Sequence, residues 1–212
     1  MTNTEDESPV RTGGGDDGRS SLIDGARRYK DDVAFDALGT LDEAQVALGV
    51  CRSLLSYRTA PFRARRRGKK DPHTDLPNRH AKRLSADLRW IQQRLLIAGG
   101  VLASTPSHPP VAEMDAIDER DLARLAEIFD HWRGMIHIPP RFFIAGDTRI
   151  GAEFDRARTV VRRAERAVVR LVRERGLPEQ AMVSRFLNYL SDFAFVLARW
   201  SDSVVRTAHH DA

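Results

Sequence analysis

Apolar residues recur at helical spacing along most of this chain, and the spacing predicts five long α-helices. The first covers about residues 31–57, the second about 78–104, and a shorter third about 116–133. In the first two, the apolar side chains fall on one face of a helix. They are Leu38, Leu41, Leu48 and Leu55 in the first, and Leu84, Leu88, Ile91, Leu95, Ala98 and Leu102 in the second.

A fourth helix over about 148–175 and a fifth over about 178–206 continue the pattern. Gly176 stands where a helix commonly ends in the left-handed conformation, and Pro178 follows it, so one helix stops there and the next begins. The apolar stripes are Ala157, Val161, Ala164, Val168 and Leu171 in the fourth helix, and Val183, Leu187, Leu190, Ala194 and Leu197 in the fifth.

The predicted fold class is all-α, a five-helix antiparallel bundle, because long helices are joined by shorter connections. The connection at 134–147 contains two prolines and then Arg141-Phe142-Phe143-Ile144, which gives it some extended character. We find no convincing β-hairpin signal and no internal repeat. The bundle forms one domain over residues 11–206, with a disordered tail at 1–10 and a short tail at 207–212.

Composition favours a globular protein of the cytoplasm. Hydrophobic residues make up 42% of the chain, yet no apolar run reaches the length of about 18 residues that a membrane span needs. The first ten residues are acidic and polar, unlike a secretory signal or a transit peptide. The single cysteine, Cys51, cannot form an internal disulfide, which fits a reducing compartment.

Charge is nearly balanced overall and concentrated locally. The net charge is +4, but residues 63–70 read RARRRGKK inside a basic insertion at 58–77. Such a block is either a solvated loop or a patch that attracts phosphates, a nucleic acid or a partner protein. Because no aromatic residues interleave with it, nucleic acid is not favoured.

Polar residues lie directly beside the apolar stripes of three helices. Arg158, Arg162 and Glu165 share one face of the fourth helix, with Arg163 and Arg166 nearby. Asn188 and Asp192 share a face of the fifth helix, and Asp42 and Glu43 follow Leu41 in the first. These groups either form a salt-bridged surface or line a cleft whose arginines neutralise phosphates.

The segment at 11–30 offers backbone amides and hydroxyls that can wrap a polyphosphate. The candidates are Thr12, Gly13, Gly18, Ser20 and Ser21, with Lys30 as an added charge. The segment lacks the GxxxxGK[ST] pattern of a P-loop, and a low-complexity tail is the alternative.

Four segments, taken in order, carry sequences that match one known family. They are Arg11-Thr12-Gly13 through GARRYKDD, which ends at Asp32, with FDALGTLDE at 35–43; Ile91-Gln92 with Leu102-Ala103; Phe142 through ARTVVRRAER, which ends at Arg166; and FLNYLSDFAFVLAR at 186–199. Together they resemble the ATP:cob(I)alamin adenosyltransferases of the PduO type, over nearly the whole chain. RTVVRRAER together with FLNYLSD is the specific part of the match.

The resemblance implies a homotrimeric five-helix bundle with active sites between subunits. It implies that ATP, with Mg²⁺, is held by the N-terminal loop, Lys30, Arg162, Glu165 and Asn188, with Arg11 and Arg166 as further cofactor-binding candidates. It implies a salt bridge between Asp42 and Arg158 near the corrin, and it places Phe142 under the corrin, where it displaces the lower ligand. Asp192 takes a structural or corrin-side supporting role.

The chemistry that the resemblance implies needs no protein nucleophile. Cobalt(I) of a reduced corrinoid such as cob(I)alamin attacks ATP itself, so the protein positions the reactants and stabilises the leaving triphosphate. No residues are predicted to bind a metal of their own. A reductase and an enzyme that uses adenosylcobalamin are the candidate protein partners.

Several positions depart from the family pattern. The glycine loop has two apparent extra residues, Ala145-Gly146-Asp147 replaces the family's PGG, Asp155 replaces a histidine, and Tyr189 replaces a basic residue. Two other functions therefore stay open. One is a weak or inactive homologue that acts as a corrinoid- or nucleotide-binding chaperone or sensor. The other is a helical interaction module that uses the basic insertion.

Overall fold

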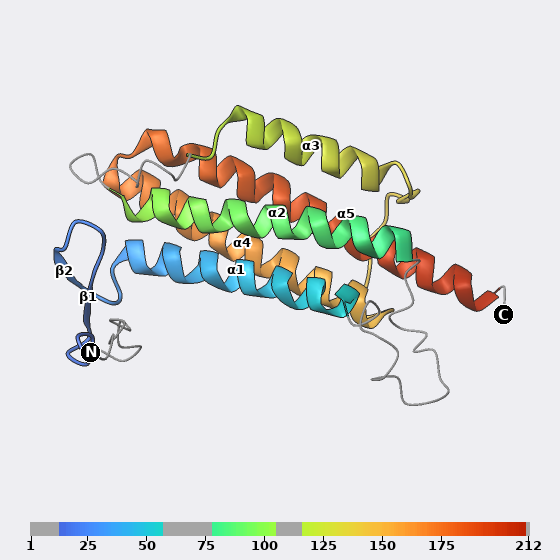
Figure 1. Ribbon diagram of the computed structural model, residues 1–212, viewed down its shortest axis with the longest axis horizontal. Coiled ribbons are helices and arrows are strands. Elements are labelled where there is room, and N and C mark those ends of the chain that lie inside the picture. The colour runs from blue at the N-terminus through green and yellow to red at the C-terminus, as the bar shows by residue number, and fades with distance from the viewer. Residues whose placement is uncertain (1–12, 57–77, 105–115, 211–212) are drawn as a thin grey trace, which may run out of the picture.

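The computed structural model describes residues 13–56, 78–104 and 116–210 (Figure 1). The predicted tail at 1–10, the insertion at 58–77, and the candidates Arg11 and Thr12 lie outside these residues. All five predicted helices are confirmed. They are α1 (Val33–Ser56), α2 (Asn78–Ala103), α3 (Glu119–Arg133), α4 (Arg149–Arg175) and α5 (Ala181–His210), with a short 3-10 turn η2 (Pro178–Gln180) before α5.

The helices begin and end close to the expected positions, for identifiable reasons. Thr148 caps α4 by accepting a hydrogen bond from the amide of Gly151, and Gly176 ends it in the left-handed conformation with φ 64°. The carboxylate of Asp118 caps α3 in a capping box with Asp121. The fifth helix continues to His210, so residues 207–210 of the predicted C-terminal tail are helical.

A small β-hairpin precedes the bundle, although the sequence shows no convincing hairpin signal, so the fold is not purely α-helical. Strands β1 (Arg19–Ser21) and β2 (Arg27–Tyr29) pair antiparallel with Ser20 opposite Arg28. These strands are too short and too polar to show an apolar alternation. The turn between them is held instead by polar contacts, since Asp24 accepts from the amide of Ala26 and forms an ion pair with Arg28.

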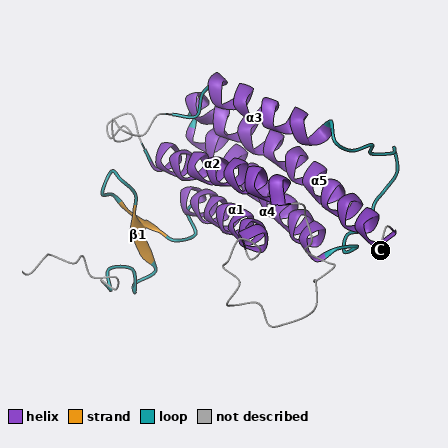
Figure 2. Ribbon diagram, turned by 45° about the vertical axis from the view of Figure 1, so that its right-hand side comes forward, coloured by secondary structure: helices purple, strands orange, loops and turns teal. Residues whose placement is uncertain are grey.

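Helix α4 packs between α1 and α5, while α2 packs on α1, and α3 lies outside against α5 and α2 (Figures 1 and 2). Successive helices alternate in direction, so the odd-numbered helices run the same way (Figure 1). Arg185 near the start of α5 pairs with Glu119 at the start of α3, and Trp200 near its end packs on Trp132, so α3 runs parallel to α5. No helix among the described residues has the length and apolar character needed to cross a membrane.

The core is apolar and closely packed, with Trp132, Trp200, Phe154, Phe186 and Phe193 among its largest fully buried side chains. It also contains Cys51, whose side chain has no solvent exposure. Burial raises the pKa of its thiol to about 12 because the thiolate would lose its hydration.

We therefore expect Cys51 to resist alkylation in the folded protein. At pH 8, iodoacetamide should leave it unmodified over hours, and it should react within minutes in guanidinium chloride. Mass spectrometry measures the adduct. Rapid labelling without denaturant would mean that α1 does not pack as described.

Candidate functional site

The predicted arginine row lies on the solvent side of α4. Arg162 and Arg166 are exposed, whereas Arg158 and Glu165 are half-buried beside them. Arg166 donates to the backbone carbonyl of Arg162 at 3.1 Å, which keeps its side chain along the helix. A shallow hollow of about 240 Å³ begins at Glu165 and Arg166 and continues toward the end of α4, where Val169, Arg170 and Arg173 also line it. The row is thus open to an anionic ligand.

Helix α5 brings Asn188 and Asp192 to the same height of the bundle as this row. The register of the antiparallel pair is given by two contacts, between Asp155 and Arg199 and between Thr148 and Asp202. When this register is continued toward the middle of the two helices, Arg162 of α4 lies at the same level along the bundle axis as Asp192 of α5. Asn188 and Asp192 are both exposed, like Arg162, so the structure places these three candidates at one level along the bundle.

Arg158 has a partner other than the one expected. Its Nε donates to Asp155 Oδ1 at 3.2 Å on the same helix. The ion pairs of Glu43 with Arg163 and of Asp32 with Arg175 fix how α1 runs along α4. In that register Asp42 lies level with Glu165, about 10 Å along the axis from Arg158. The predicted salt bridge between Asp42 and Arg158 is therefore not made within one chain.

The glycine-rich segment forms two tight turns that lead into the hairpin. The amide of Asp16 donates to Gly13 and that of Gly18 to Gly15, and both Gly13 and Gly18 have positive φ, at 69° and 77°. Lys30 Nζ donates to the carbonyl of Gly15 at 2.7 Å. Lys30 therefore closes the turn, and its ammonium lies beside the glycine backbone.

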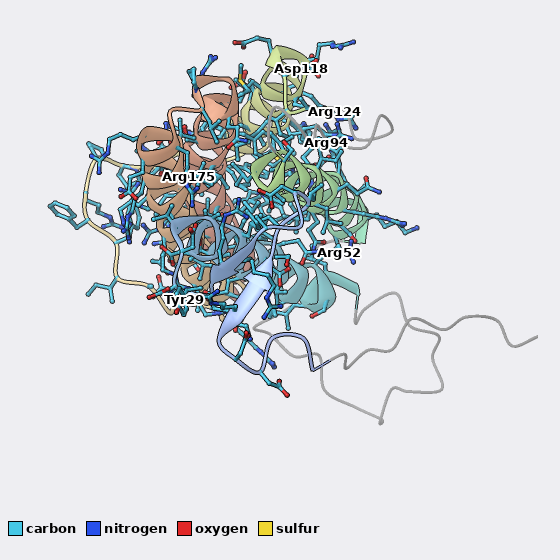
Figure 3. The ribbon with its side chains drawn as sticks, turned by 90° about the vertical axis from the view of Figure 1, so that its left-hand side faces the viewer. Tyr29, Arg52, Arg94, Asp118, Arg124 and Arg175 are labelled. Carbon is cyan, nitrogen blue, oxygen red and sulfur yellow. The ribbon has the colours of Figure 1, made fainter. Side chains whose placement is uncertain are left out.

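One ion pair attaches this segment to the end of α4. Arg175 Nη2 donates to both carboxylate oxygens of Asp32, at 2.7 and 2.6 Å. Burial alone would raise the pKa of Asp32, but the amide of Ala34 and the guanidinium of Arg175 together lower it below its usual value. Figure 3 looks onto this end of the bundle, with Tyr29 of the hairpin and Arg175 labelled.

The stability that this pair contributes should not depend on pH in the neutral range. A carboxyl group with a lowered folded-state pKa contributes above its unfolded-state pKa, near 3.8, and loses its contribution as the pH falls through the lower folded value. We expect amide exchange of residues 19–29 to be equally slow at pH 6 and pH 8 after correction for intrinsic rates. Asp32→Asn should speed it severalfold, and no change in that variant would mean that the pair does not hold the hairpin.

The structure does not bring every candidate together in one chain. Arg162 lies about 20 Å along α4 from Arg175, and therefore from the end that carries Lys30. The hairpin and the connection after α3 lie at opposite ends of the bundle (Figure 1). Lys30 and Phe142 therefore cannot reach the same small molecule from a single subunit.

Phe142 lies in that connection and is fully exposed, at 104% of its reference area, with Ile144 at 90%. Phe142 is therefore not part of the core. The connection and the end of α5 enclose a hollow of about 370 Å³, lined by Ile136, His137, Ile138, Pro139, Arg141, Phe142, Phe143, Ile144, Asp147, Arg199, Asp202 and Ser203. An exposed aromatic side chain beside such a hollow is available to a flat, apolar ligand.

Sequence reasoning missed a buried charged cluster under this hollow. Arg199 forms ion pairs with Asp155 and Asp202, and Thr148 donates to Asp202 at 2.7 Å. Asp155 stood out only as a departure from the family pattern. A visible signal was the arginine that ends the apolar run FAFVLAR, since a charged side chain there has to be paired.

The described residues contain no group of three His, Cys, Asp or Glu side chains placed to hold a metal. Mg²⁺ at nucleotide sites keeps several waters and binds the phosphates with one or two carboxylates. Glu165, half-buried within the arginine row, fits that modest requirement as a water-bridged contact for MgATP.

Comparison with known proteins gives one consistent result. A profile of the cobalamin adenosyltransferase family matches residues 10–201. The chain is 31% identical over 192 residues to a corrinoid adenosyltransferase of Citrobacter freundii, covering 90% of this chain and 93% of the relative. It is 30% identical over 194 residues to corrinoid adenosyltransferase MMAB of Homo sapiens, covering 91% of this chain and 68% of the relative.

Solved structures agree. A variant PduO-type ATP:corrinoid adenosyltransferase from Lactobacillus reuteri, complexed with cobalamin and ATP, superposes with a TM-score of 0.73 at 28% identity, covering 93% of both chains. A second variant from the same organism, complexed with ATP, gives 0.72 at 28% identity, covering 93% of this chain and 96% of the other. The chain belongs to the cobalamin adenosyltransferase family, and specifically resembles its PduO-type members.

Proposed function

We propose that this chain transfers the 5′-deoxyadenosyl group of ATP to cobalt(I) of a reduced corrinoid and releases triphosphate. The observation that carries the proposal is the row of Arg158, Arg162, Glu165 and Arg166 on α4, with Arg162 and Arg166 exposed, in a chain of this family. A row of guanidinium groups open to solvent suits a polyphosphate, which forms charge-assisted hydrogen bonds with arginine.

The reaction asks the protein for positioning and charge stabilisation. The electron pair of cobalt(I) attacks C5′, the C5′–O bond breaks, and its electrons leave with the triphosphate while cobalt becomes formally Co(III). Arg162 and Arg166 stabilise the charge that grows on the leaving group, with Lys30 and the amides of the glycine turns. No general base is needed because no proton is removed from the nucleophile.

Phe142 acts at the other substrate. Its ring projects fully into solvent beside the hollow at the end of α5, so it can lie against the lower face of a corrin. Displacing the lower ligand removes electron density from cobalt, which makes the reduction to cobalt(I) easier. Phe142 is therefore assigned to the corrin and the arginine row to ATP.

A homotrimer with sites between subunits reconciles these assignments with the distances. Lys30 lies about 20 Å along the bundle from the level of Arg162, so one subunit supplies the glycine turns and its neighbour supplies the row. The exposed Asp42 can likewise approach Arg158 of a neighbouring copy while Arg158 Nε stays bonded to Asp155. Exposed Val46 on α1 and Val169 on α4 offer apolar contact area for such packing.

An anaerobic assay tests the function directly. We expect purified protein with MgATP and chemically reduced cob(I)alamin to yield the alkyl-cobalt absorbance spectrum and one triphosphate per product. Binding of the corrinoid without either product would support the chaperone or sensor alternative. The interaction-module alternative predicts salt-dependent binding of a partner that is lost when Arg65, Arg66 and Arg67 become alanine.

A further inference from the structure

A buried cluster of charges lies where α4 begins and α5 ends, beneath the connection that carries Phe142. The side chain of Arg199 is 4% exposed, that of Asp155 8% and that of Asp202 9%. Arg199 Nη2 lies 3.2 Å from Asp202 Oδ2 and also bonds Asp155. With Arg158 on the other oxygen of Asp155, two guanidinium groups face two carboxylates, so the cluster is balanced in charge.

The surrounding chain is shaped to accept this cluster. Thr148 caps α4 and donates to Asp202 Oδ1 at the same time. A Cβ on Gly151 would lie only 2.1 Å from Asp202 Oδ1, so glycine leaves the space that this carboxylate occupies. Burial raises the pKa of Asp202, and the hydroxyl of Thr148 and the charge of Arg199 oppose that rise. Burying charges is costly, which indicates a role beyond filling the core.

The cluster reaches the connection through one aromatic ring. Arg199 Nε is buried and has no hydrogen-bond partner within the described part of the chain, and its guanidinium lies 5.0 Å from the ring centre of Phe143. Phe195 packs edge-on against Phe143 at 5.9 Å, and Arg141 covers it at 5.4 Å. Phe143 is thus held between two arginines and a second ring.

The position of Phe143 sets the direction of its neighbour. Exposure alternates along residues 142–144 of the connection. Phe143 is half-buried against Arg199, while Phe142 and Ile144 on either side of it are almost fully exposed. Holding the ring of Phe143 in place therefore also restricts the direction of the adjacent Phe142.

We propose that Arg199, held flat by Asp155 and Asp202, is a positioning residue that uses Phe143 to hold Phe142 against the lower face of the corrin. The proposal rests on the proposed function, and specifically on the role of Phe142. Arg199 touches no substrate in this scheme. Its planar guanidinium matters because a lysine keeps the charge but offers no flat surface for the ring.

Arg199→Lys tests the proposal. We expect kcat to fall about tenfold while KM for ATP changes by less than about twofold, because a loosely held Phe142 spends less time in place. With bound cob(II)alamin and MgATP, electron paramagnetic resonance should show more cobalt still carrying its lower-ligand nitrogen, seen as added nitrogen splitting. A purely structural role would lower the melting temperature without changing that spectrum.

Two further variants separate this role from misfolding. Phe143→Leu leaves the ion cluster intact and should reproduce both the kcat loss and the nitrogen splitting. Arg185→Lys alters an exposed ion pair on the same helix and should change neither. In a Phe142→Ala background, Arg199→Lys should have little additional effect, because Arg199 acts only through Phe142.

The outcomes are distinct. If Arg199→Lys and Phe143→Leu leave the spectrum and kcat unchanged, the positioning role is overturned. It is also overturned if the kcat losses of Arg199→Lys and Phe142→Ala are fully additive. In both cases turnover by the wild type still upholds the proposed function. If wild type itself neither adenosylates cobalt nor loses its lower ligand, the proposed function fails and the positioning role fails with it.

Discussion

Arg162→Ala should lower kcat for adenosyl transfer by about 100- to 1000-fold, the usual effect of removing one strong donor from a developing anion. The triphosphate gains charge as the C5′–O bond breaks, so the guanidinium contributes more in the transition state than in the ground state. Arg162 is exposed and outside the core, so the variant should fold and melt like wild type.

Arg156→Ala is the matched control for this variant. Arg156 is also an exposed arginine of α4, and its partner is Glu153 on the same helix at 2.7 Å. Its removal should change kcat by less than about twofold, as is typical of a surface ion pair. Near-normal turnover in Arg162→Ala, or equal losses in both variants, would contradict the assignment of the arginine row to ATP.

Phe142→Ala should lower kcat by about 10- to 100-fold, or about 1.4–2.7 kcal/mol in the activation barrier. For this variant the assay starts from cob(II)alamin with a reductant, and the expected cause is that the lower ligand stays on cobalt, so less of the bound corrinoid becomes cobalt(I). KM for ATP should hardly change, because the arginine row is intact. Stability should hardly change either, because the ring makes no core contact.

Met135→Ala provides a comparison for Phe142→Ala, since Met135 is another exposed apolar residue of the same connection and does not line the hollow. Its turnover should stay close to that of wild type. If Phe142→Ala weakened only ATP binding, the ring would belong to the nucleotide site and not to the corrin.

The helices of the bundle could be predicted because the signals for each helix lie within its own stretch of sequence. Apolar side chains recur with the period of a helix, and Gly176 stands where α4 ends. The hairpin at 19–29 could not be found in this way. It is stabilised by the Asp24 carboxylate and a bond from Lys30 back to Gly15, contacts that leave no periodic trace.

The candidate site could likewise be predicted only in part. Arg158, Arg162, Glu165 and Arg166 share a face because helical spacing dictates it. Their positions along the bundle axis relative to Lys30 and Phe142 depend on the register between helices. The spacing of residues within one helix carries no information about that register. Arg199 was missed because its role comes from Asp155 on another helix and Phe143 on a connection, brought together only by packing.

A complementation experiment most directly tests the claim that ATP is gripped by residues of two subunits. Lys30→Ala and Arg162→Ala, each nearly inactive alone, are co-expressed with different tags and the mixed oligomers are purified through both. If each site takes Lys30 from one copy and Arg162 from the next, every mixed trimer should regain one of its three sites, about a third of wild-type activity. Mixed oligomers as inactive as the parent variants would contradict the shared site.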